Sequence, residues 1–463
     1  MATLIADQLA SDPRVLEARK LLTAALRDHQ CKLTGIQASD PARAAEYAKI
    51  IADFSQARAG GLYFPYLGSG LGHGALVELA DGSVKYDFIS GIGVHFLGHS
   101  HTLLLNSGIS AALSDTVMQG NLQQNCNSTP VVSLLLQMAK AAGARLEHCF
   151  ITTSGAMANE NALKLMFQRK PGSTRMLAFE HGFCGRTMVL SQITDKPQYR
   201  AGLPSTLPVD YIPFFDTSDP KRSIEKAVLA LSTHLHRYPG QHAGMCIELI
   251  LGEGGYWVGD HDFFLALLTE LKAHNIAVWF DEIQTFGRTS RPFAFEHFNL
   301  AQWADVVTVG KLTQLCATLF TPEFKPQPGL LSQTFTASAS AIAAAEAILK
   351  MMIQGDLFGP GGRNMQVHAM ITQRLEAIAA RHPQLLHGPY GLGGMIAFTP
   401  LDGSEAHVKM LLKAMFDAGV IAFYAGSNPA RIRMLPPVPV VTQQDIGMVC
   451  DIVESTLVAC AGI

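Results

Sequence analysis

Short β-rich runs alternate with segments of helical periodicity from Cys149 onward. The runs read CFITT, MLAFE, MCIELI, AVWFD and VVTV, and helices are expected at about residues 156–169 and 263–274. Such alternation is typical of βαβ units, in which helices cover both faces of a largely parallel sheet. We therefore expect an α/β fold for this part of the chain.

Two of these predicted strands lead into reactive side chains. The run at 276–280 ends in Asp281, and the run at 306–309 is followed by Gly310 and Lys311. Because the carboxyl ends of parallel strands face one crevice, the acid and the amine are expected to meet there. A buried carboxylate needs a cation, which a protonated ring nitrogen would supply. Lys311 could form a Schiff base and shuttle protons, although most lysines after a strand lie at the surface.

The segment Thr153–Ala156 follows a predicted strand and opens a helix. The free N–H groups and the positive end of such a helix form a cradle for an anion such as phosphate. The alternative is an ordinary turn in which Ser154 caps the helix.

The turn GFCGRT follows the next strand and contains Phe183 and Arg186. An aromatic ring in this place can stack on a flat heterocycle, and an arginine can bind a carboxylate through two parallel hydrogen bonds. The alternative is a tight turn with a surface arginine.

Other polar residues lie near the strand ends. Gln284 could donate to a ring oxygen, Glu282 is expected to be a structural or solvated acid, and Glu248 in the run MCIELI needs a partner. Strand-like alternation places Arg431 and Arg433 on one face. There they either recognise an acidic substrate or lie in solvent.

Composition and charge restrict the class of protein. The chain has 463 residues, 48% apolar and 16% charged, which indicates a large folded core. A net charge of -3 gives no basic field for nucleic acid, and no apolar run approaches the roughly 18 residues of a membrane span. The N-terminus lacks the features of a signal peptide, and the eight cysteines are scattered singly. We expect a cytoplasmic protein with reduced thiols and no metal site.

The remaining segments are expected to form a second, smaller domain. A helix is expected at 41–57, a β-hairpin at 75–88 and, after a helix at 339–352, an interruption at 355–363. We predict four parts: an N-terminal helical segment at 1–60, a large domain at 101–352, and a small α+β domain made from 61–100 and 353–463.

Five motifs occur in the order and at the spacing of a known family. They read SGAMANENALK, HGFCGRT, ELILGEGG, FDEIQTFGRT with FAFEHF, and DVVTVGK. From about Tyr63 to its C-terminus the chain resembles the class III aminotransferases, which include lysine, ornithine, acetylornithine and 4-aminobutyrate enzymes. The resemblance implies the type I fold of pyridoxal-phosphate enzymes. It also implies ping-pong transfer of an amino group from an amino acid or ω-amine to 2-oxoglutarate.

The resemblance implies roles for single residues around pyridoxal 5′-phosphate. Gly155 and Ala156 would hold the phosphate, and Phe183 would stack on the ring. Asp281 would pair with the ring nitrogen, while Lys311 would bind the aldehyde and act as the base. The remaining cofactor contacts would come from Ser154, Glu248, Gln284 and Thr334.

The resemblance also bears on substrates and assembly. Thr334 resembles a threonine that reaches the phosphate of the neighbouring subunit, which implies a homodimer with shared active sites. Glu253 and Arg433 match an acid and an arginine that pair until an α-carboxylate binds. Arg186 matches the arginine that takes the distal carboxylate of 2-oxoglutarate.

The chain departs from the family at positions related to the substrate. The loop after Gln284 is one glycine shorter, the stretch after Lys311 reads LTQLCATLF, and an aromatic pair of ornithine-type enzymes is replaced by Gln123 and Gln124. These features and the run ITDKPQYRAGLP favour an ω-amino donor such as lysine. The alternatives are a decarboxylase or an aminomutase with the same cofactor, or a non-catalytic protein that keeps the fold.

Overall fold

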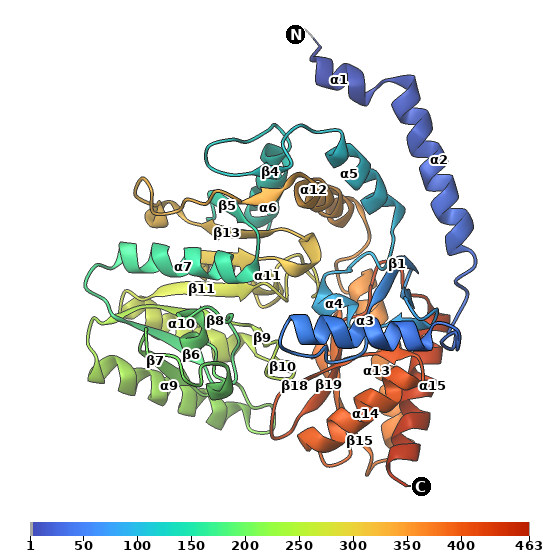
Figure 1. Cartoon of the computed structure of the whole chain (residues 1–463). Coiled ribbons are helices and arrows are strands. Elements are labelled where there is room, and N and C mark those ends of the chain that lie inside the picture. The colour runs from blue at the N-terminus through green and yellow to red at the C-terminus, as the bar shows by residue number, and fades with distance from the viewer. Residues whose placement is uncertain (1–2, 463) are drawn as a thin grey trace.

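The alternating segment forms a seven-stranded sheet in the computed structural model, which describes residues 3–462 (Figure 1). The strand order is β5-β13-β12-β11-β8-β6-β7. β13 runs antiparallel to β5 and β12, and the other neighbouring pairs are parallel. The predicted α/β class is confirmed. The strands are β5 (His148–Thr152), β6 (Arg175–Phe179), β7 (Val209–Ile212), β8 (His242–Ile247), β11 (Ala277–Glu282), β12 (Val306–Val309) and β13 (Cys316–Phe320).

Helices cover both faces of this sheet because side chains along its buried strands alternate between two apolar cores. On β8, Cys246 belongs to the core beneath α7 (Gly155–Arg169), whereas Met245 and Ile247 belong to the core on the opposite face. That second core contains α6 (Ser128–Ala141), α9 (Pro220–Arg237), α10 (His261–Ala273) and α12 (Ala339–Gln354).

Two four-stranded sheets lie outside the large sheet. The first joins distant segments in the order β1-β2-β3-β17, and the second has the order β15-β16-β19-β18. Their strands are β1 (Gly68–His73), β2 (Leu76–Leu79), β3 (Val84–Asp87), β15 (Leu386–Leu392), β16 (Met395–Pro400), β17 (Val420–Ile421), β18 (Phe423–Ala425) and β19 (Arg431–Met434). β2 and β3 form the predicted hairpin. The helices of this region are α13 (Arg363–Arg381), α14 (Glu405–Asp417) and α15 (Gln443–Cys460).

The N-terminal helices α1 (Ile5–Ala10) and α2 (Pro13–Gln30) reach away from the body of the molecule (Figure 1). α2 packs on α5 (Thr102–Ala112), where Arg19 donates to Ser110 over 2.9 Å. Within residues 3–462 no helix is both long and apolar enough to cross a membrane. Other elements are α3 (Ala44–Ala57), α4 (Ser90–Gly93), β4 (Met118–Gln119), α8 (Leu190–Ile193), β9 (Ile250–Leu251), β10 (Trp257–Val258), α11 (Ala294–His297), the 3₁₀ turn η3 (Lys311–Thr313) and β14 (Ala337–Ser338).

Candidate active site

A cavity of about 440 Å³ lies where β5, β6, β8, β11 and β12 end. Such a crevice at the carboxyl ends of parallel strands is where α/β proteins bind ligands. Most residues predicted for the site line this cavity, namely Gly155, Ala156, Phe183, Arg186, Glu248, Glu253, Asp281, Gln284 and Lys311. The sheet therefore brings together residues that are far apart in the sequence.

The start of α7 forms one end of the cavity. Ser154 caps the helix, since its hydroxyl accepts a hydrogen bond from the N–H of Met157 over 3.2 Å. Gly155 lies so close to Ile283 that an added Cβ would be 2.9 Å from the Cγ2 atom of Ile283. First-turn N–H groups lack partners within the helix, so the backbone of Gly155 and Ala156 can bind an anion. The cap by Ser154 is confirmed, and it leaves the N–H groups of Gly155 and Ala156 without a partner inside the helix.

Asp281 is a buried acid at the end of β11. Its Oδ1 accepts from the N–H of Ile283 over 3.0 Å, and its Oδ2 accepts from Nδ2 of Asn159 over 2.7 Å. Burial raises the pKa of Asp281 to about 6, although these hydrogen bonds oppose the rise. A cation placed in the cavity would stabilise the ionised form.

Lys311 opens the turn η3 directly after β12. Its φ angle of 52° lies in the left-handed region, which is costly for a lysine and is found most often where function requires it. Burial lowers the pKa of Lys311 to about 8, while Glu253 opposes that shift. A neutral amine, which can act as nucleophile or base, is therefore available close to neutral pH. The alternative of a solvated surface lysine is wrong.

Glu248 connects two loops of the site. One carboxylate oxygen accepts from the N–H of Phe183 over 2.7 Å, and the other accepts from the N–H of Gly252 over 3.0 Å. Burial, with a contribution from the charge of Asp281, raises the pKa of Glu248 to about 8. The carboxyl group thus holds the turn after β6 against the loop after β8.

Gln284 lies against the loop after β8. An added Cβ on Gly252 would be 3.0 Å from its amide group, so that loop needs a glycine. The Oε1 atom of Gln284 is buried and has no hydrogen-bond partner among the described residues. A buried polar atom without a partner is rare and points to a missing ligand or water.

The two arginines of β19 are both buried, so the expectation that they could lie in solvent is wrong. Arg433 forms an ion pair with Glu253. Arg431 instead stacks on Trp257 and Tyr390, with its guanidinium carbon 3.8 and 3.5 Å from the two ring centroids. Its Nη1 also donates to the carbonyl of Gly255 over 2.7 Å. Arg431 is therefore part of the scaffold beside the site.

Arg186 is exposed at the rim of the cavity. Its guanidinium carbon is 3.9 Å from the ring centroid of Tyr199 and 6.0 Å from that of Phe183. Nearby Lys196 is buried, and burial lowers its pKa although Glu253 opposes the shift. Sequence reasoning did not assign Lys196 or Tyr199. Both lie in the run ITDKPQYR, whose charged and aromatic residues after a motif turn were the available signal.

Thr334 is exposed and does not line the cavity of its own chain. Its backbone carbonyl instead packs on Gly120, where an added Cβ would clash with it.

Glu282 is buried, with its carboxylate accepting from the N–H groups of Ala294 and Phe295 at the start of α11. Of the two expectations for Glu282, the structural one is confirmed and the solvated one is wrong.

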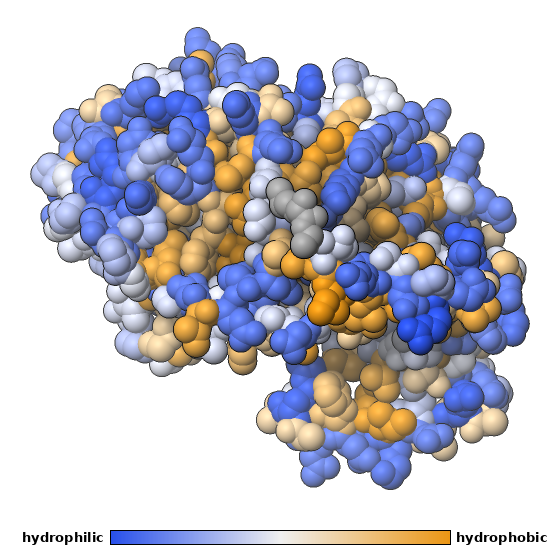
Figure 2. All heavy atoms as spheres, turned by 90° about the horizontal axis from the view of Figure 1, so that it is seen from above, coloured by the Kyte–Doolittle hydropathy of each residue, from blue (hydrophilic) through white to orange (hydrophobic). Residues whose placement is uncertain are grey.

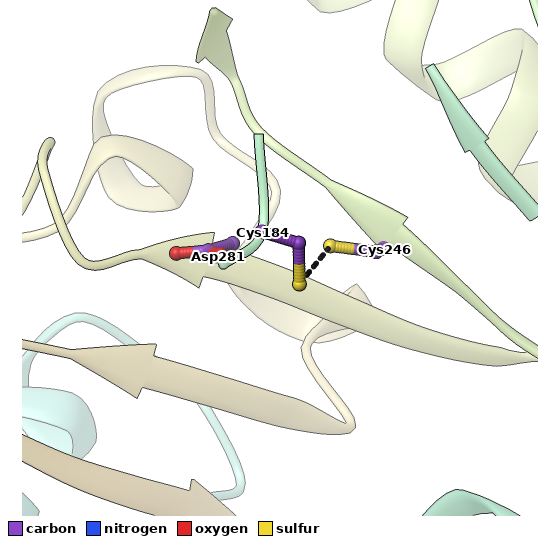
Figure 3. A group of neighbouring side chains, drawn as sticks. All are labelled: Cys184, Cys246 and Asp281. Atoms are coloured by element: carbon purple, nitrogen blue, oxygen red, sulfur yellow. Dashed lines mark hydrogen bonds between the residues drawn. The ribbon is translucent and has the colours of Figure 1, made fainter. Parts of the chain in front are cut away.

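Two cysteines lie beside Asp281 (Figure 3). The sulfur atoms of Cys184 and Cys246 are 3.9 Å apart, and their thiols and the Asp281 carboxylate lie within 4.8 Å of one another. Burial raises the pKa of Cys246 to about 11 and raises the pKa of Cys184 well above its ordinary value, so both thiols are neutral. Within residues 3–462 every cysteine is free.

Comparison with known proteins identifies the family. The profile of the family Aminotransferase class-III matches residues 69–457. An acetylornithine aminotransferase from Bacillus subtilis (strain 168) is 30% identical over 378 residues, which is 79% of this chain and 89% of the relative. The corresponding enzyme of Gloeobacter violaceus is 28% identical over 382 residues, covering 79% of this chain and 87% of the relative.

Solved structures agree in fold. A lysine aminotransferase from M. tuberculosis superimposes with a TM-score of 0.76 at 24% identity, covering 84% of this chain and 93% of that structure. An ornithine aminotransferase from Toxoplasma gondii ME49 gives a TM-score of 0.76 at 20% identity, covering 90% and 96%. The chain therefore belongs to the class-III aminotransferases, a family of pyridoxal-phosphate-dependent enzymes, and it is a transaminase.

Proposed function

We propose that the cavity binds pyridoxal 5′-phosphate and that Lys311 and Asp281 hold its opposite ends. The observation that carries this proposal is the presence of both residues in one cavity, an amine with a lowered pKa and a buried acid that forms no ion pair within residues 3–462. The free N–H groups of Gly155 and Ala156 suit the phosphate. The unpartnered Oε1 atom of Gln284 is a buried acceptor at which a hydrogen-bond donor of a bound molecule would fit. Phe183 and Ile283 supply apolar surface for the ring itself.

The chain's own residues then have defined tasks. When bound, the cofactor supplies an electron sink for charge that develops at the substrate carbon. The Asp281 carboxylate favours a proton on the nitrogen that faces it. The Lys311 amine accepts a proton from the substrate carbon and returns it later. Glu248 keeps the Phe183 turn in place through its hydrogen bond from the N–H of Phe183.

For the substrates we propose an ω-amino donor, acetylornithine or lysine, with 2-oxoglutarate as acceptor. The names of the relatives support the donor class. Arg186 at the rim and buried Lys196 provide positive charge for a distal carboxylate. Arg433, once separated from Glu253, would bind the α-carboxylate of the second substrate.

We also propose a homodimer with shared active sites. Thr334 is exposed and lies outside its own chain's cavity, which fits a contact with a neighbouring subunit. Apolar side chains are exposed in the same region, with Val117 70%, Leu122 102% and Phe335 58% exposed. Seen from above, apolar residues gather between polar ones on this face (Figure 2). A second copy would cover them.

The experiment that tests the function adds pyridoxal phosphate to purified protein and records its visible absorption. A new band should appear, and it should be lost on addition of the true donor amine. Stoichiometric formation of glutamate from 2-oxoglutarate would then support transamination with that donor. Release of carbon dioxide without an amino acid product would contradict it, and so would turnover that survives Lys311→Ala.

A further inference from the structure

Asn159 connects two parts of the site that come from different strands. It lies in the second turn of α7 and is almost fully buried, with 2% of its surface exposed. Its Nδ2 donates to Oδ2 of Asp281 over 2.7 Å and to the backbone carbonyl of Cys184 over 2.7 Å. One amide group therefore joins the acid at the end of β11 to the turn that carries Phe183.

Little else supports the charge of Asp281. Within residues 3–462 its carboxylate accepts two hydrogen bonds, one from the backbone of Ile283 and one from Asn159. Figure 3 shows that the thiols of Cys184 and Cys246 occupy the neighbouring space. Since burial keeps both thiols protonated, they offer at most weak hydrogen bonds to the carboxylate. Asn159 thus gives the ionised form a side-chain hydrogen bond, to which the charge of Lys311 adds a further favourable contribution.

We propose that Asn159 is a positioning residue. Its side-chain amide holds the Asp281 carboxylate ionised and oriented, and it also fixes the turn that carries Phe183 relative to this carboxylate. The inference rests on the proposed function, in which Asp281 faces the ring nitrogen of the cofactor and Phe183 faces the ring. Asn159 acts through Asp281 and the Phe183 turn and has no chemical step of its own.

The proposal predicts the direction in which the pH dependence of cofactor affinity changes when Asn159 is removed. Pairing needs an ionised carboxylate, so affinity falls as the pH drops through the pKa of Asp281, which lies at about 6. A hydrogen bond to the ionised form lowers that pKa, and its removal raises it. Without Asn159, the loss of affinity should therefore begin at a higher pH. The ionisable groups of the free cofactor also make its affinity depend on pH, but this contribution is the same for all variants and drops out when variants are compared.

The test measures equilibrium binding of pyridoxal phosphate to cofactor-free protein between pH 5.5 and 8.5. We expect Asn159→Ala to bind about tenfold more weakly or worse at pH 7, with its midpoint shifted to higher pH. Asn159→Asp keeps the shape but replaces the donor by a second acid, so it should shift the midpoint further.

Asn161→Ala is the matched control. Asn161 lies on the same helix and is equally buried, but its Nδ2 has no hydrogen-bond partner in the described part of the chain. Its removal should leave cofactor affinity within about twofold, because no bond to a charged group is lost. A general effect of cavities in α7 would instead weaken both variants alike and overturn the inference.

A double substitution separates positioning from folding. In an Asp281→Asn background there is no carboxylate charge to support, so adding Asn159→Ala should cause a clearly smaller further loss of affinity, which reflects only the bond to the Cys184 carbonyl. Equal losses with and without Asp281 would contradict the proposal. Wild-type affinity and pH midpoint in Asn159→Ala would overturn the role of Asn159 and leave the proposed function intact. Failure of the wild-type protein to bind the cofactor would overturn both.

Discussion

The guanidinium of Arg433 lies 2.5 Å from the carboxylate of Glu253, measured from Nη2 to Oε1. Arg433 is completely buried and does not line the cavity, whereas Glu253 does. Burial alone would raise the pKa of Glu253, but Arg433 and then Lys311 lower it, so the acid is ionised. Glu253, which lines the cavity, therefore occupies the guanidinium of Arg433, and the proposed binding of a substrate carboxylate by Arg433 requires that Glu253 be displaced.

This arrangement predicts that Glu253 limits the use of α-carboxylates. In Glu253→Gln the charge that competes for Arg433 is removed. The kcat/KM for an α-amino donor such as glutamate should then rise about tenfold relative to an ω-amino donor, as expected for a charge-assisted bond gained. Steady-state kinetics with both donors measure the ratio. Arg431→Lys, on the same strand, should lower thermal stability and leave the ratio unchanged; an unchanged ratio in Glu253→Gln would contradict the gate.

A second prediction concerns Asp281. Asp281→Asn is nearly isosteric but cannot pair as an anion with a protonated ring nitrogen. We expect cofactor affinity to fall about ten- to hundredfold, which corresponds to about 1.5–3 kcal/mol for a hydrogen bond to a charged group, and turnover to fall further. Spectral titration with pyridoxal phosphate measures the affinity. Glu282→Gln, at the adjacent residue of the same strand, is the control and should retain cofactor binding.

The pKa of Lys311 yields a third prediction. Its amine must be neutral to attack the cofactor's aldehyde, and burial lowers its pKa to about 8. The rate at which cofactor-free protein is reconstituted should therefore rise with pH and level off above about 8, instead of rising towards 10. Stopped-flow absorbance follows the reaction. Lys311→Ala should show no such phase, and a midpoint near that of a free lysine would refute the desolvated site.

Sequence patterns predicted the central sheet and the crevice because both depend on local signals. Alternating β-rich and helical runs define the strands, and parallel strands direct Asp281 and Lys311 to one edge. The patterns could not separate Arg431 from Arg433, since period-two alternation places both on one face. Their tertiary contacts distinguish them: Arg431 packs between Trp257 and Tyr390, whereas Arg433 forms an ion pair with Glu253.

The supporting residues were harder to predict for the same reason. Asn159 looks like any polar residue in a helix until α7 packs on the sheet beside Asp281. Lys196 follows no strand, and its burial results from folding of the segment after the Phe183 turn. Such contacts join positions more than a hundred residues apart in the case of Asn159 and Asp281, so no local periodicity records them.

A fourth prediction links Glu282 to stability. Burial raises the pKa of Glu282 from 4.5 to about 7, so the folded protein holds this proton over a pH range in which the unfolded chain has lost it. Stability contributed by the group is complete below about pH 4.5 and is lost as the pH rises through about 7. Glu282→Gln should have a lower melting temperature at pH 5, because one acceptor is lost, and a flatter decline between pH 5 and 7. Differential scanning fluorimetry across this range measures both. A decline as steep as that of wild type would assign the proton to another group.

A fifth prediction tests the shared active site through Thr334. If Thr334 serves the neighbouring subunit, the lysine and threonine of one site come from different chains, and the Lys311→Ala and Thr334→Ala lesions of a mixed dimer fall in the same site. A dimer with one subunit of each kind then has one doubly damaged site and one intact site. Random assembly makes about half of the dimers mixed, so the mixture should regain roughly a quarter of wild-type activity. The variants assayed separately give the baseline. If Thr334 acted within its own chain, every site of the mixed dimer would carry one lesion, and mixing would restore nothing above that baseline.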